Sequence, residues 1–552
     1  MKPLLVLQAR MSSSRLPGKV LKPVAGLPAV VLAVKRATNL GADLVVATSR
    51  DSADDALVEV LEQHGIRVAR GSLENVLARF VDAIGDVPDE TVLVRLTGDN
   101  MLPDGAFLKE LVGEFVASGL DYLGTNSPRD HLPYGLSAEA FRAEGLRKAH
   151  ALATTDYERE HVTPWLKTRA RAAIYIPPSL GDVDYSQLRV TVDDETDYAR
   201  MVRLFEQVSD PVRVGWRELV ERVASLPDEP QFRVAFREAA GGLHSELTLG
   251  TVQLGMSYGR ANVSGQPALE QAREIVHTAI AHGVTAVDTA RVYGESEAVL
   301  GEVLTGAWHS RVQVITKLDP LTKLAIDASA EDVRAAVDAS VEASQTALRL
   351  AKLPVLLLHR WELRRAWGGA VWQRLLELRD AGRIGKLGAS VSHPREALEA
   401  LADADVKHLQ LPFNLLDWRW TEAGVDAAAL RRPDVVVHGR SALLQGVLAA
   451  GAETWPEVPG VDAVECLRVL AALAKELGRE NVVDLCLAYV RSQAWITSVV
   501  VGCETVAQLR DILGLFRRPR LTVAECETVR GSVPRMPEAL LNPANWTKFQ
   551  MA

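Results

Sequence analysis

Residues 4–19 read LLVLQARMSSSRLPGK, an apolar run that leads directly into a cluster of serines and cations. The run at 4–9 predicts a buried strand, because short apolar stretches bounded by turn residues are typical of strands. The cluster after it offers guanidinium, ammonium and hydroxyl groups, and Pro17-Gly18 permits a tight turn. Cations and backbone N–H groups in such a loop predict a cradle for polyphosphate. A solvated basic loop is the alternative, and composition alone does not decide between them.

Outward from this stretch, apolar runs alternate with helical patterns through the first part of the chain. Further strands are predicted at 43–49, 66–71 and 90–99, and helices at 28–41, 54–65 and 74–84. This βαβα order predicts an α/β domain with a mainly parallel sheet and helices on both faces. The Walker pattern of phosphate-binding loops is absent from the sequence.

Strand and helix patterns resume at Leu247 and continue to the end of the chain. Eight apolar runs lie at 247–255, 285–290, 312–318, 355–360, 384–391, 408–414, 435–444 and 496–502. Eight βα units in about 300 residues predict a (β/α)₈ TIM barrel. An open, doubly wound sheet is the alternative, but the G-x-G-x-x-G turn that would favour it is missing.

Two domains joined by a linker are therefore expected. The stretch 226–246 combines Pro, Gly-Gly and many charges without an apolar period, as linkers do. The predicted limits are 1–225 for the first domain, 226–246 for the linker and 247–552 for the barrel.

Composition narrows the class of protein. A net charge of −9 gives no basic face for nucleic acid, and no apolar run reaches the roughly 18 residues of a membrane span. Four cysteines without metal-ligand spacing are expected to be buried thiols. We expect a soluble cytoplasmic protein that binds neither nucleic acid nor membrane.

Four polar residues mark the ends of successive barrel strands. Asp288, Lys317 and His359 end three predicted strands, and Tyr293 follows in the next loop. Active sites of barrels form at this end of the strands. A lysine beside a tyrosine lowers the pKa of the phenol, an aspartate fixes the lysine, and a histidine can orient a carbonyl. A lone lysine here would indicate a structural ion pair, whereas four residues in register favour proton transfer to a carbonyl.

The first domain resembles the acidic-sugar cytidylyltransferases over about residues 3–205. The motifs LQARMSSSRLPGKVL, VVATSRDSADD, RGSLENVLARF, VRLTGDN, LPYGLSAEAF, EREHVTPW and RVTVDDETD occur in family order. The resemblance implies transfer of CMP from CTP to an acidic sugar, with Mg²⁺ held by Asp99 and Asp193. The sequence GDNML stands where the family often has GDCP, which puts the sugar specificity in question.

The resemblance also implies further site residues in the first domain. Arg15 and Lys19 would stabilise the triphosphate and the leaving pyrophosphate. The implied nucleotide-binding residues are Arg10, Ser13, Ser14, Arg15, Lys19, Gly71, Ser72, Asn75 and Arg79. The implied sugar-binding residues are Glu139, Glu160 and His161, although His161 is equally compatible with a structural role.

Most of residues 247–520 resembles the aldo/keto reductases, through the tetrad Asp288, Tyr293, Lys317 and His359. The implied cofactor is NADPH or NADH. The implied cofactor-binding residues are Ser390, Gln410, Arg440, Ser441, Leu443, Gly446, Gly502 and Gln508. Val391 replaces a usual asparagine, and Arg440 replaces the aromatic residue that usually stacks on nicotinamide. Gly502 and Gln508 stand where cations often bind the 2′-phosphate of NADPH, so NADH is also an option.

Taken together, the sequence predicts a bifunctional enzyme of surface-glycan sugar metabolism. One domain would activate an acidic, nonulosonate-like sugar as its CMP derivative. The other would oxidise or reduce a related sugar. The alternatives are an active reductase fused to a non-catalytic sugar-nucleotide-binding module, and a barrel that serves as a cofactor-free scaffold. A homodimer through the first domain is a further expectation.

Overall fold

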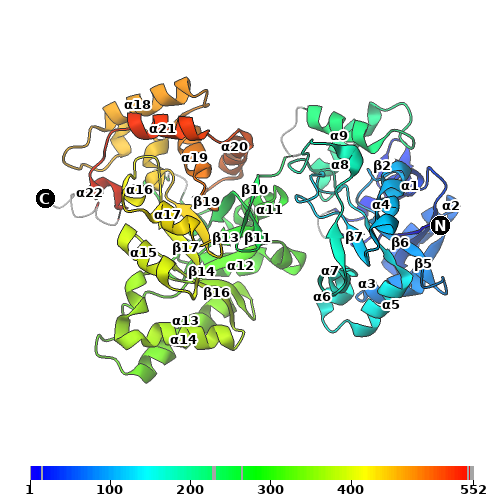
Figure 1. Ribbon diagram of the computed structural model, residues 1–552, viewed down its shortest axis with the longest axis horizontal. Coiled ribbons are helices and arrows are strands. Elements are labelled where there is room, and N and C mark those ends of the chain that lie inside the picture. Colours follow the sequence, from blue (N-terminus) through cyan, green and yellow to red (C-terminus); the bar gives the residue numbers. More distant parts are fainter. Residues whose placement is uncertain are drawn as a thin grey trace. The chain divides into compact units, whose positions relative to one another are not determined.

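The computed structural model of the chain describes residues 2–13, 16–226, 232–260, 262, 265–543 and 546. The chain divides into two compact units, residues 1–233 and 234–552 (Figure 1). Among the described residues, no helix has the length and hydropathy needed to cross a bilayer.

Unit 1 is built on a seven-stranded sheet in the order β5-β4-β1-β6-β8-β7-β9. The strands are β1 Leu4–Gln8, β4 Asp43–Ser49, β5 Val68–Gly71, β6 Val92–Thr97, β7 Tyr122–Gly124, β8 Glu139–Arg142 and β9 Ala172–Ile174. The predicted strands β1, β4, β5 and β6 are parallel, whereas β8 runs antiparallel to both of its neighbours. The predicted mainly parallel sheet is therefore confirmed, and the short strands β7, β8 and β9 were not foreseen.

Helices cover both faces of this sheet because successive side chains of a strand point to opposite sides. Leu5 and Leu7 of β1 join the core beneath α1 Ala29–Ala37 and α4 Gly105–Ser118. Leu4 and Val6 join the core beneath α3 Val76–Ile84 and α5 Ala143–Leu152. Further helices of unit 1 are α2 Asp55–Gln63, α6 Asp156–His161, α7 Pro164–Arg169, α8 Glu195–Glu206 and α9 Trp216–Ser225.

Unit 2 is a closed barrel of eight parallel strands, as predicted. The strands are β12 Leu247–Gly250, β13 Ala286–Asp288, β14 Gln313–Lys317, β15 Leu353–Leu358, β16 Ile384–Ser390, β17 Val406–Pro412, β18 Val436–Arg440 and β19 Ser498–Gly502. The ring closes where β12 pairs with β19, from Leu247 opposite Val499 to Gly250 opposite Gly502.

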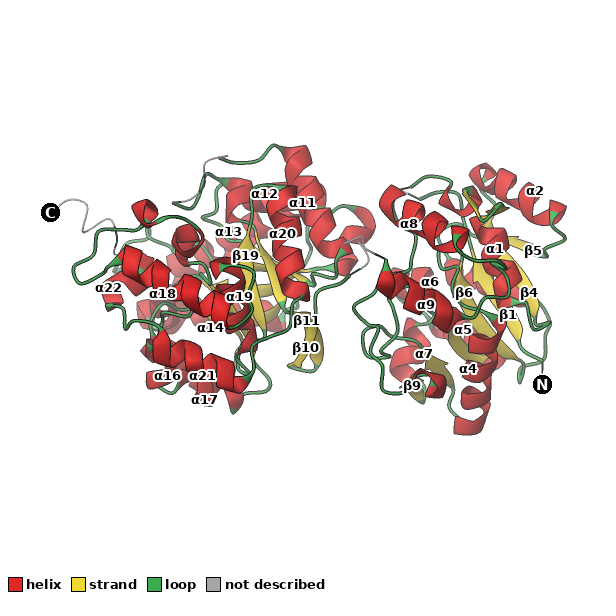
Figure 2. Cartoon of the chain, turned by 90° about the horizontal axis from the view of Figure 1, so that it is seen from above, coloured by secondary structure: helices red, strands yellow, loops and turns green. Residues whose placement is uncertain are grey.

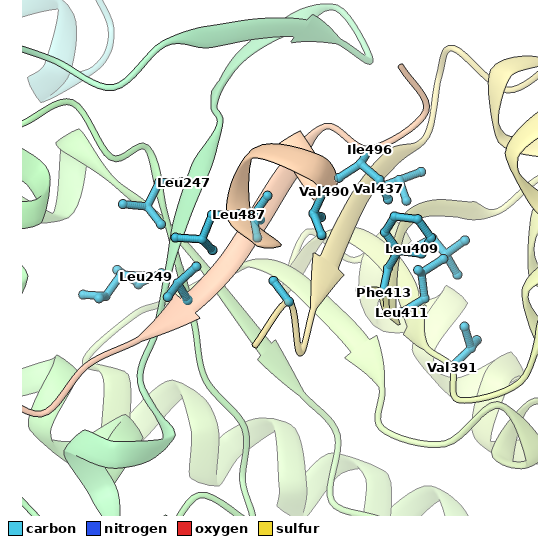
Figure 3. Close-up of a cluster of buried hydrophobic side chains, with 14 of the residues drawn as sticks. Leu247, Leu249, Val391, Leu409, Leu411, Phe413, Val437, Leu487, Val490 and Ile496 are labelled. Carbon is cyan, nitrogen blue, oxygen red and sulfur yellow. The ribbon is translucent and has the colours of Figure 1, made fainter. Parts of the chain in front are cut away.

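Helices surround the barrel strands (Figure 2). They include α11 Leu269–Ala281, α12 Ser296–Val303, α13 Ala330–Leu348, α14 Ala370–Asp380, α15 Pro394–Ala402, α17 Val425–Leu430, α18 Ala463–Glu476, α19 Val482–Ser492, α20 Val506–Arg517 and α21 Val523–Ser532. The apolar side chains of the strands pack against these helices; Figure 3 shows part of this core, with residues of β12, β17, β18 and α19 labelled.

The barrel interior holds the alternate residues of each strand. Ala286, Ile315, Val355 and Leu357 form a small buried cluster that is separate from the outer core. Because side chains alternate along a strand, Asp288 and Lys317 lie on the same side of their strands as this cluster. The alternation of side chains along β13 and β14 thus places Asp288 and Lys317 inside the barrel at its carboxyl end.

A hairpin occupies part of the predicted linker. β10 Phe236–Ala239 pairs antiparallel with β11 Gly242–Ser245, and Ala240 and Gly241 have φ of 50° and 73°. Positive φ at both central residues is what a tight hairpin turn requires, so Ala240 and Gly241 form a turn within the predicted linker rather than a flexible tether. The fully buried carboxylate of Glu246 forms ion pairs with Arg237, Arg491 and Arg520. These ion pairs bind the hairpin to the barrel.

Candidate active sites

The loop after β1 is anchored to the neighbouring strand. The backbone N–H of Met11 donates to Oδ1 of Asp54 at 2.7 Å, and Asp54 also accepts from Thr48 and from Ser49. Burial would raise the pKa of Asp54, but these hydrogen bonds outweigh it and lower the pKa. Asp54 therefore stays ionised and fixes the start of the loop, a role that no sequence signal revealed.

Within the loop, the structure places only some of the predicted phosphate-binding residues. Arg10 is exposed, and Ser13 Oγ accepts from the N–H of Leu16 at 3.4 Å. Ser14 and Arg15 lie outside the described residues. Gly18 has φ of 68°, which turns the chain into a short helix beginning at Lys19.

Lys19 joins the two aspartates that the sequence assigns to a metal. Its Nζ lies 3.0 Å from Oδ2 of Asp99 and 3.3 Å from Oδ1 of Asp193, and it donates to the carbonyl of Val192 at 2.7 Å. Asp99 follows β6, and its own carbonyl accepts from the N–H of Val192 at 3.1 Å. Lys19, Asp99 and Asp193, which are far apart in the sequence, thus meet at the carboxyl edge of the parallel strands, where ligands of such sheets bind.

The two carboxylates suit a divalent cation in chemistry. Both direct an oxygen at one ammonium group, and carboxylate oxygens are ligands that Mg²⁺ prefers. The other oxygen of Asp193 is held by Arg189 at 2.7 Å, and Asp197 in turn accepts from Arg189. The described residues contain no group of three or more His, Cys, Asp or Glu placed to hold a metal.

The other four predicted nucleotide-binding residues, Gly71, Ser72, Asn75 and Arg79, lie together at the start of α3. Asn75 caps this helix through a 2.9 Å bond from the N–H of Ala78, and Ser72 Oγ accepts from the N–H of Asn75 at 3.0 Å. Arg79 is buried and donates to the carbonyl of Ser72 at 3.1 Å. A Cβ on Gly71 would lie 2.8 Å from Cγ of Arg79, so this close packing requires glycine.

Of the predicted sugar-binding residues, Glu139 is buried in an ion cluster. It contacts Arg95 at 2.6 Å and Lys167 at 2.5 Å. Burial alone would raise the pKa of Glu139, but the charges of Arg95 and Lys167 bring the pKa to about 2. The sequence did not reveal the role of either cation: Arg95 lies within the motif VRLTGDN, whose aspartate was assigned to the metal, and Lys167 lies outside the quoted motifs.

Glu160 and His161 lie at the end of α6. Glu160 is exposed, and the half-buried ring of His161 stands 4.5 Å from the ring of Tyr157. Burial lowers the pKa of His161, and the charges of Arg95 and Lys167 lower it further against an opposing contribution from Glu160. His161 is therefore electrostatically coupled to the ion cluster around Glu139.

The barrel tetrad converges on one buried lysine. Nζ of Lys317 lies 2.8 Å from both oxygens of Asp288 and 3.3 Å from the hydroxyl of Tyr293, and it donates to the carbonyl of Thr289 at 3.0 Å. Burial would lower the pKa of Lys317, but the charge of Asp288 outweighs it and the pKa is raised. Lys317 is therefore an ammonium ion throughout the neutral range.

His359 completes the group as a neutral ring. The rings of His359 and Tyr293 stand edge to face, with centroids 6.3 Å apart. Burial, together with the charges of Lys317, Arg440 and Arg360, lowers the pKa of His359 to about 3. A neutral imidazole can donate one hydrogen bond to a carbonyl without adding charge.

The predicted cofactor-binding residues also lie at this end of the barrel. Ser390 is paired with Gln410 in the β16–β17 register, and Gln410 Nε2 donates to Oδ1 of Asp288 at 2.7 Å. Arg440 ends β18 and donates to the carbonyl of Val391 at 3.3 Å. The backbone after it is left-handed at Ser441, Leu444, Gln445 and Gly446, and Leu443 lies between them. Such backbone strain is typical of ligand-binding loops.

The last two predicted cofactor residues flank the start of α20. Gly502 ends β19, and a Cβ there would lie 2.1 Å from Oε1 of Gln253. The Gln508 amide is engaged locally: Oε1 accepts from the N–H of Glu504 at 2.8 Å, and Nε2 donates to the Glu504 carboxylate at 3.1 Å. Gln508 therefore caps the helix. The carboxylate of Glu504 lies beside it, next to the positions where cations often bind the 2′-phosphate of NADPH.

Comparison with known proteins assigns each unit. Residues 4–210 match the model of the cytidylyltransferase family, and residues 246–533 match that of the aldo/keto reductase family. The spore coat polysaccharide biosynthesis protein SpsF of Bacillus subtilis (strain 168) is 34% identical over 242 residues, which cover 42% of this chain and 98% of that protein. A 3-deoxy-manno-octulosonate cytidylyltransferase of Acidovorax sp. (strain JS42) is 29% identical over 167 residues, 28% of this chain and 62% of that protein.

Among solved structures, an aldo-keto reductase of Bacillus halodurans in its holo form is 19% identical. The match covers 55% of this chain and 98% of that one, with a TM-score of 0.44. The family models place the tetrad inside one family and the Lys19 cluster inside the other. The chain belongs to the cytidylyltransferases over its first unit and to the aldo/keto reductase family over its second, and is a fusion of the two.

Proposed function

We propose that the chain is a bifunctional enzyme of surface-glycan sugar metabolism. Unit 1 would transfer CMP from CTP to an acidic, nonulosonate-like sugar and release pyrophosphate. Unit 2 would carry out an NAD(P)-dependent redox step on a related sugar. The printed names of the relatives, a spore coat polysaccharide biosynthesis protein and a 3-deoxy-manno-octulosonate cytidylyltransferase, support this choice of substrates.

The observation that carries the redox proposal is the contact of Lys317 with both Asp288 and Tyr293. The hydroxyl of Tyr293, 3.3 Å from Nζ of Lys317, would give its proton to the carbonyl oxygen of a substrate. Asp288 would keep Lys317 charged and in place. The neutral ring of His359 would orient the carbonyl. A bound nicotinamide dinucleotide would supply or accept the hydride.

The transfer proposal rests on the convergence of Lys19, Asp99 and Asp193. A sugar hydroxyl would attack the α-phosphorus of CTP, forming an O–P bond as the bond to pyrophosphate breaks. Lys19 would balance charge on the phosphates, with Arg10 and Arg15 beside it in the sequence. Mg²⁺ held by Asp99 and Asp193 would supply positive charge against the triphosphate.

The experiment is a pair of assays on the full chain. CTP, Mg²⁺ and a panel of 2-keto sugar acids should release pyrophosphate, and NADH or NADPH should be oxidised by a reactive aldehyde. Titration of NADH and NADPH fluorescence compares their affinities. Dinucleotide turnover without pyrophosphate release, when CTP binds, would favour a non-catalytic sugar-nucleotide-binding unit 1.

A cytoplasmic location and a homodimer through unit 1 stay part of the proposal. CTP and nicotinamide dinucleotides are cytoplasmic metabolites, and the four cysteines are buried free thiols, as a reducing compartment favours. Sedimentation of the full chain tests the dimer.

A further inference from the structure

The ion cluster around Glu139 contains more positive than negative charge at its centre. Nη1 of Arg95 lies 2.6 Å from Oε2 of Glu139, and Nζ of Lys167 lies 2.5 Å from Oε1. Two cations from different elements, β6 and α7, therefore share a single buried carboxylate. The exposed side chain of Glu160 acts on His161, whose pKa it raises against burial and the opposing charges of Arg95 and Lys167.

Glu139 has no hydrogen-bonding capacity left for a ligand. The hydroxyl of Tyr122 donates to Oε1 at 2.9 Å, and the hydroxyl of Thr163 lies 3.1 Å and 3.2 Å from the two oxygens. With Arg95 and Lys167, four protein groups fill the roughly four lone-pair positions of a carboxylate. Glu139 is also 7% exposed. The expectation that Glu139 itself faces the sugar is replaced by a role in holding the two cations.

The cations do retain donors. Nε and Nη2 of Arg95 donate to Oε1 of Gln8 at 3.2 Å and 3.0 Å, and Nη1 donates to Glu139. Two of its five N–H groups therefore have no partner among the described residues. The Lys167 side chain is 44% exposed, and its ammonium lies 5.6 Å from the centre of the Tyr122 ring. Both cations therefore keep N–H donors for the oxygens of a ligand.

The cluster lies on the strand that leads to Asp99. Arg95 and Thr97 point to the same side of β6, and Asp99 follows two residues later. Gln8, which orients Arg95, ends β1 just before the phosphate loop. An anion bound by Arg95 would therefore stand beside the site proposed for the triphosphate, at the same edge of the sheet.

We propose that Arg95 and Lys167 bind the carboxylate of the sugar that unit 1 activates, and that Glu139 is the positioning residue for both. This inference rests on the proposed function of unit 1. It assigns the selection of acidic over neutral sugars to two cations that lie outside the phosphate loop.

The test uses the full chain and the variants Lys167→Met, Arg95→Gln and the pair combined. Arg169→Met is the matched control, because Arg169 is a half-exposed cation on the same helix that pairs with Glu158 at 3.5 Å. Pyrophosphate release is measured at saturating CTP with 2-keto sugar acids, including 3-deoxy-manno-octulosonate and N-acetylneuraminate, and with their methyl esters. Isothermal titration measures CTP binding separately.

We expect the KM for the acid to rise about 10-fold in Lys167→Met and about 100-fold in the pair, the usual effect of losing charge-assisted hydrogen bonds. The preference for acid over ester should shrink in parallel, with CTP affinity and the control unchanged. An unchanged KM in Lys167→Met, whose exposed side chain permits folding, overturns the inference. So does a chain that turns over esters as well as acids. A chain that turns over no acid, or that fails to bind CTP, overturns the proposed function itself.

Discussion

At the scale of single residues, the two sites share one design. In each, a lysine is held between oxygens supplied by distant parts of the chain: Lys19 by Asp99 and Asp193, and Lys317 by Asp288 and Tyr293. Lys317 is 1% exposed, so its charge acts on its neighbours with little screening by water. Removing one partner should therefore change the chemistry of the groups that remain.

Tyr293→Phe should slow the reductase by about 10²–10⁴-fold, the usual contribution of a positioned general acid. The ring is retained, so the edge-to-face contact with His359 should survive. Single-turnover oxidation of NADH and NADPH by 4-nitrobenzaldehyde measures the effect, with dinucleotide binding as the control. Reduction of the aldehyde at the unmutated rate would remove Tyr293 from the proposed chemistry.

Lys317→Met should also slow turnover, and the double variant with Tyr293→Phe should lose less than the two separate losses combined. The reason is that the two groups act as one unit across a 3.3 Å contact. The same single-turnover assay on the three variants gives the coupling. Strictly additive losses would mean that the lysine and the tyrosine act independently.

Sequence patterns revealed the residues with a recognisable spacing and missed those that act through a neighbour. The tetrad positions follow strand ends, so their meeting in space could be predicted. The roles of Asp54, Arg189 and Arg95 could not be predicted, although all three lie in motifs of the resemblance, because a motif does not show which partner the fold brings near. The roles of Ser14 and Arg15 stay predictions.

At the scale of elements, β17 and β18 place two histidines inside the barrel. His408 and His438 are each 1% exposed, with ring centroids 4.4 Å apart, and none of their nitrogens has a partner among the described residues. Burial, followed by the charge of His244, lowers the pKa of His438 to about 3. Burial, followed by the charges of His438, His244, Lys386 and Lys317, lowers the pKa of His408 well below 6.5.

These strands should make the barrel sensitive to acid. Below pH 6.5 the histidines of the unfolded chain take up protons that the folded ones do not. The free energy of unfolding therefore decreases as the pH is lowered, until the pKa of the folded histidines is reached. Each histidine contributes up to about 1.4 kcal/mol per pH unit. Calorimetry from pH 7 to pH 4 should show a shallower fall of Tm in His408→Leu/His438→Leu, with exposed His64→Gln as the control. Parallel curves would contradict the neutral pair.

The hairpin β10–β11 depends on one carboxylate. Glu246→Gln should destabilise unit 2 by about 3–5 kcal/mol, because Arg237 and Arg491 would keep their charge in a buried place without its partner. Denaturant unfolding measures the loss, and the exposed residue Glu527 provides a matched Glu→Gln control on α21. A loss no larger than that of the control would show that the ion cluster does not anchor the hairpin.

Elements were predictable where they were long or regular. All eight barrel strands fall on apolar runs, whereas β7, β8 and β9 have only three or four residues and no periodic pattern. The hairpin was missed for another reason. Its Gly-Gly sequence and charged strands are typical of a linker, and the ion pair of Arg237 with Glu246 forms only in the folded protein.

At the scale of the whole molecule, each unit has its own hydrophobic core. Asp99→Asn should therefore reduce pyrophosphate release by at least about 10²-fold, as loss of an electrostatic group in a phosphoryl-transfer site does. Aldehyde reduction by the same variant should stay within about two-fold, given the separate cores. Parallel assays on one preparation decide the matter. Equal loss of both activities in a folded variant would contradict two independent sites.

The ring closure of the barrel also sets an order of events during synthesis. The sheet of unit 1 is complete once β9 has left the ribosome. β12 must wait for β19, because Leu247 pairs with Val499 roughly 250 residues later. At roughly 5–20 residues per second, one edge of the nascent barrel stays unpaired for roughly 10–50 s. Exposed strand edges can pair with other chains, so we expect unit 2 to be the part of this protein that is more exposed to aggregation during synthesis.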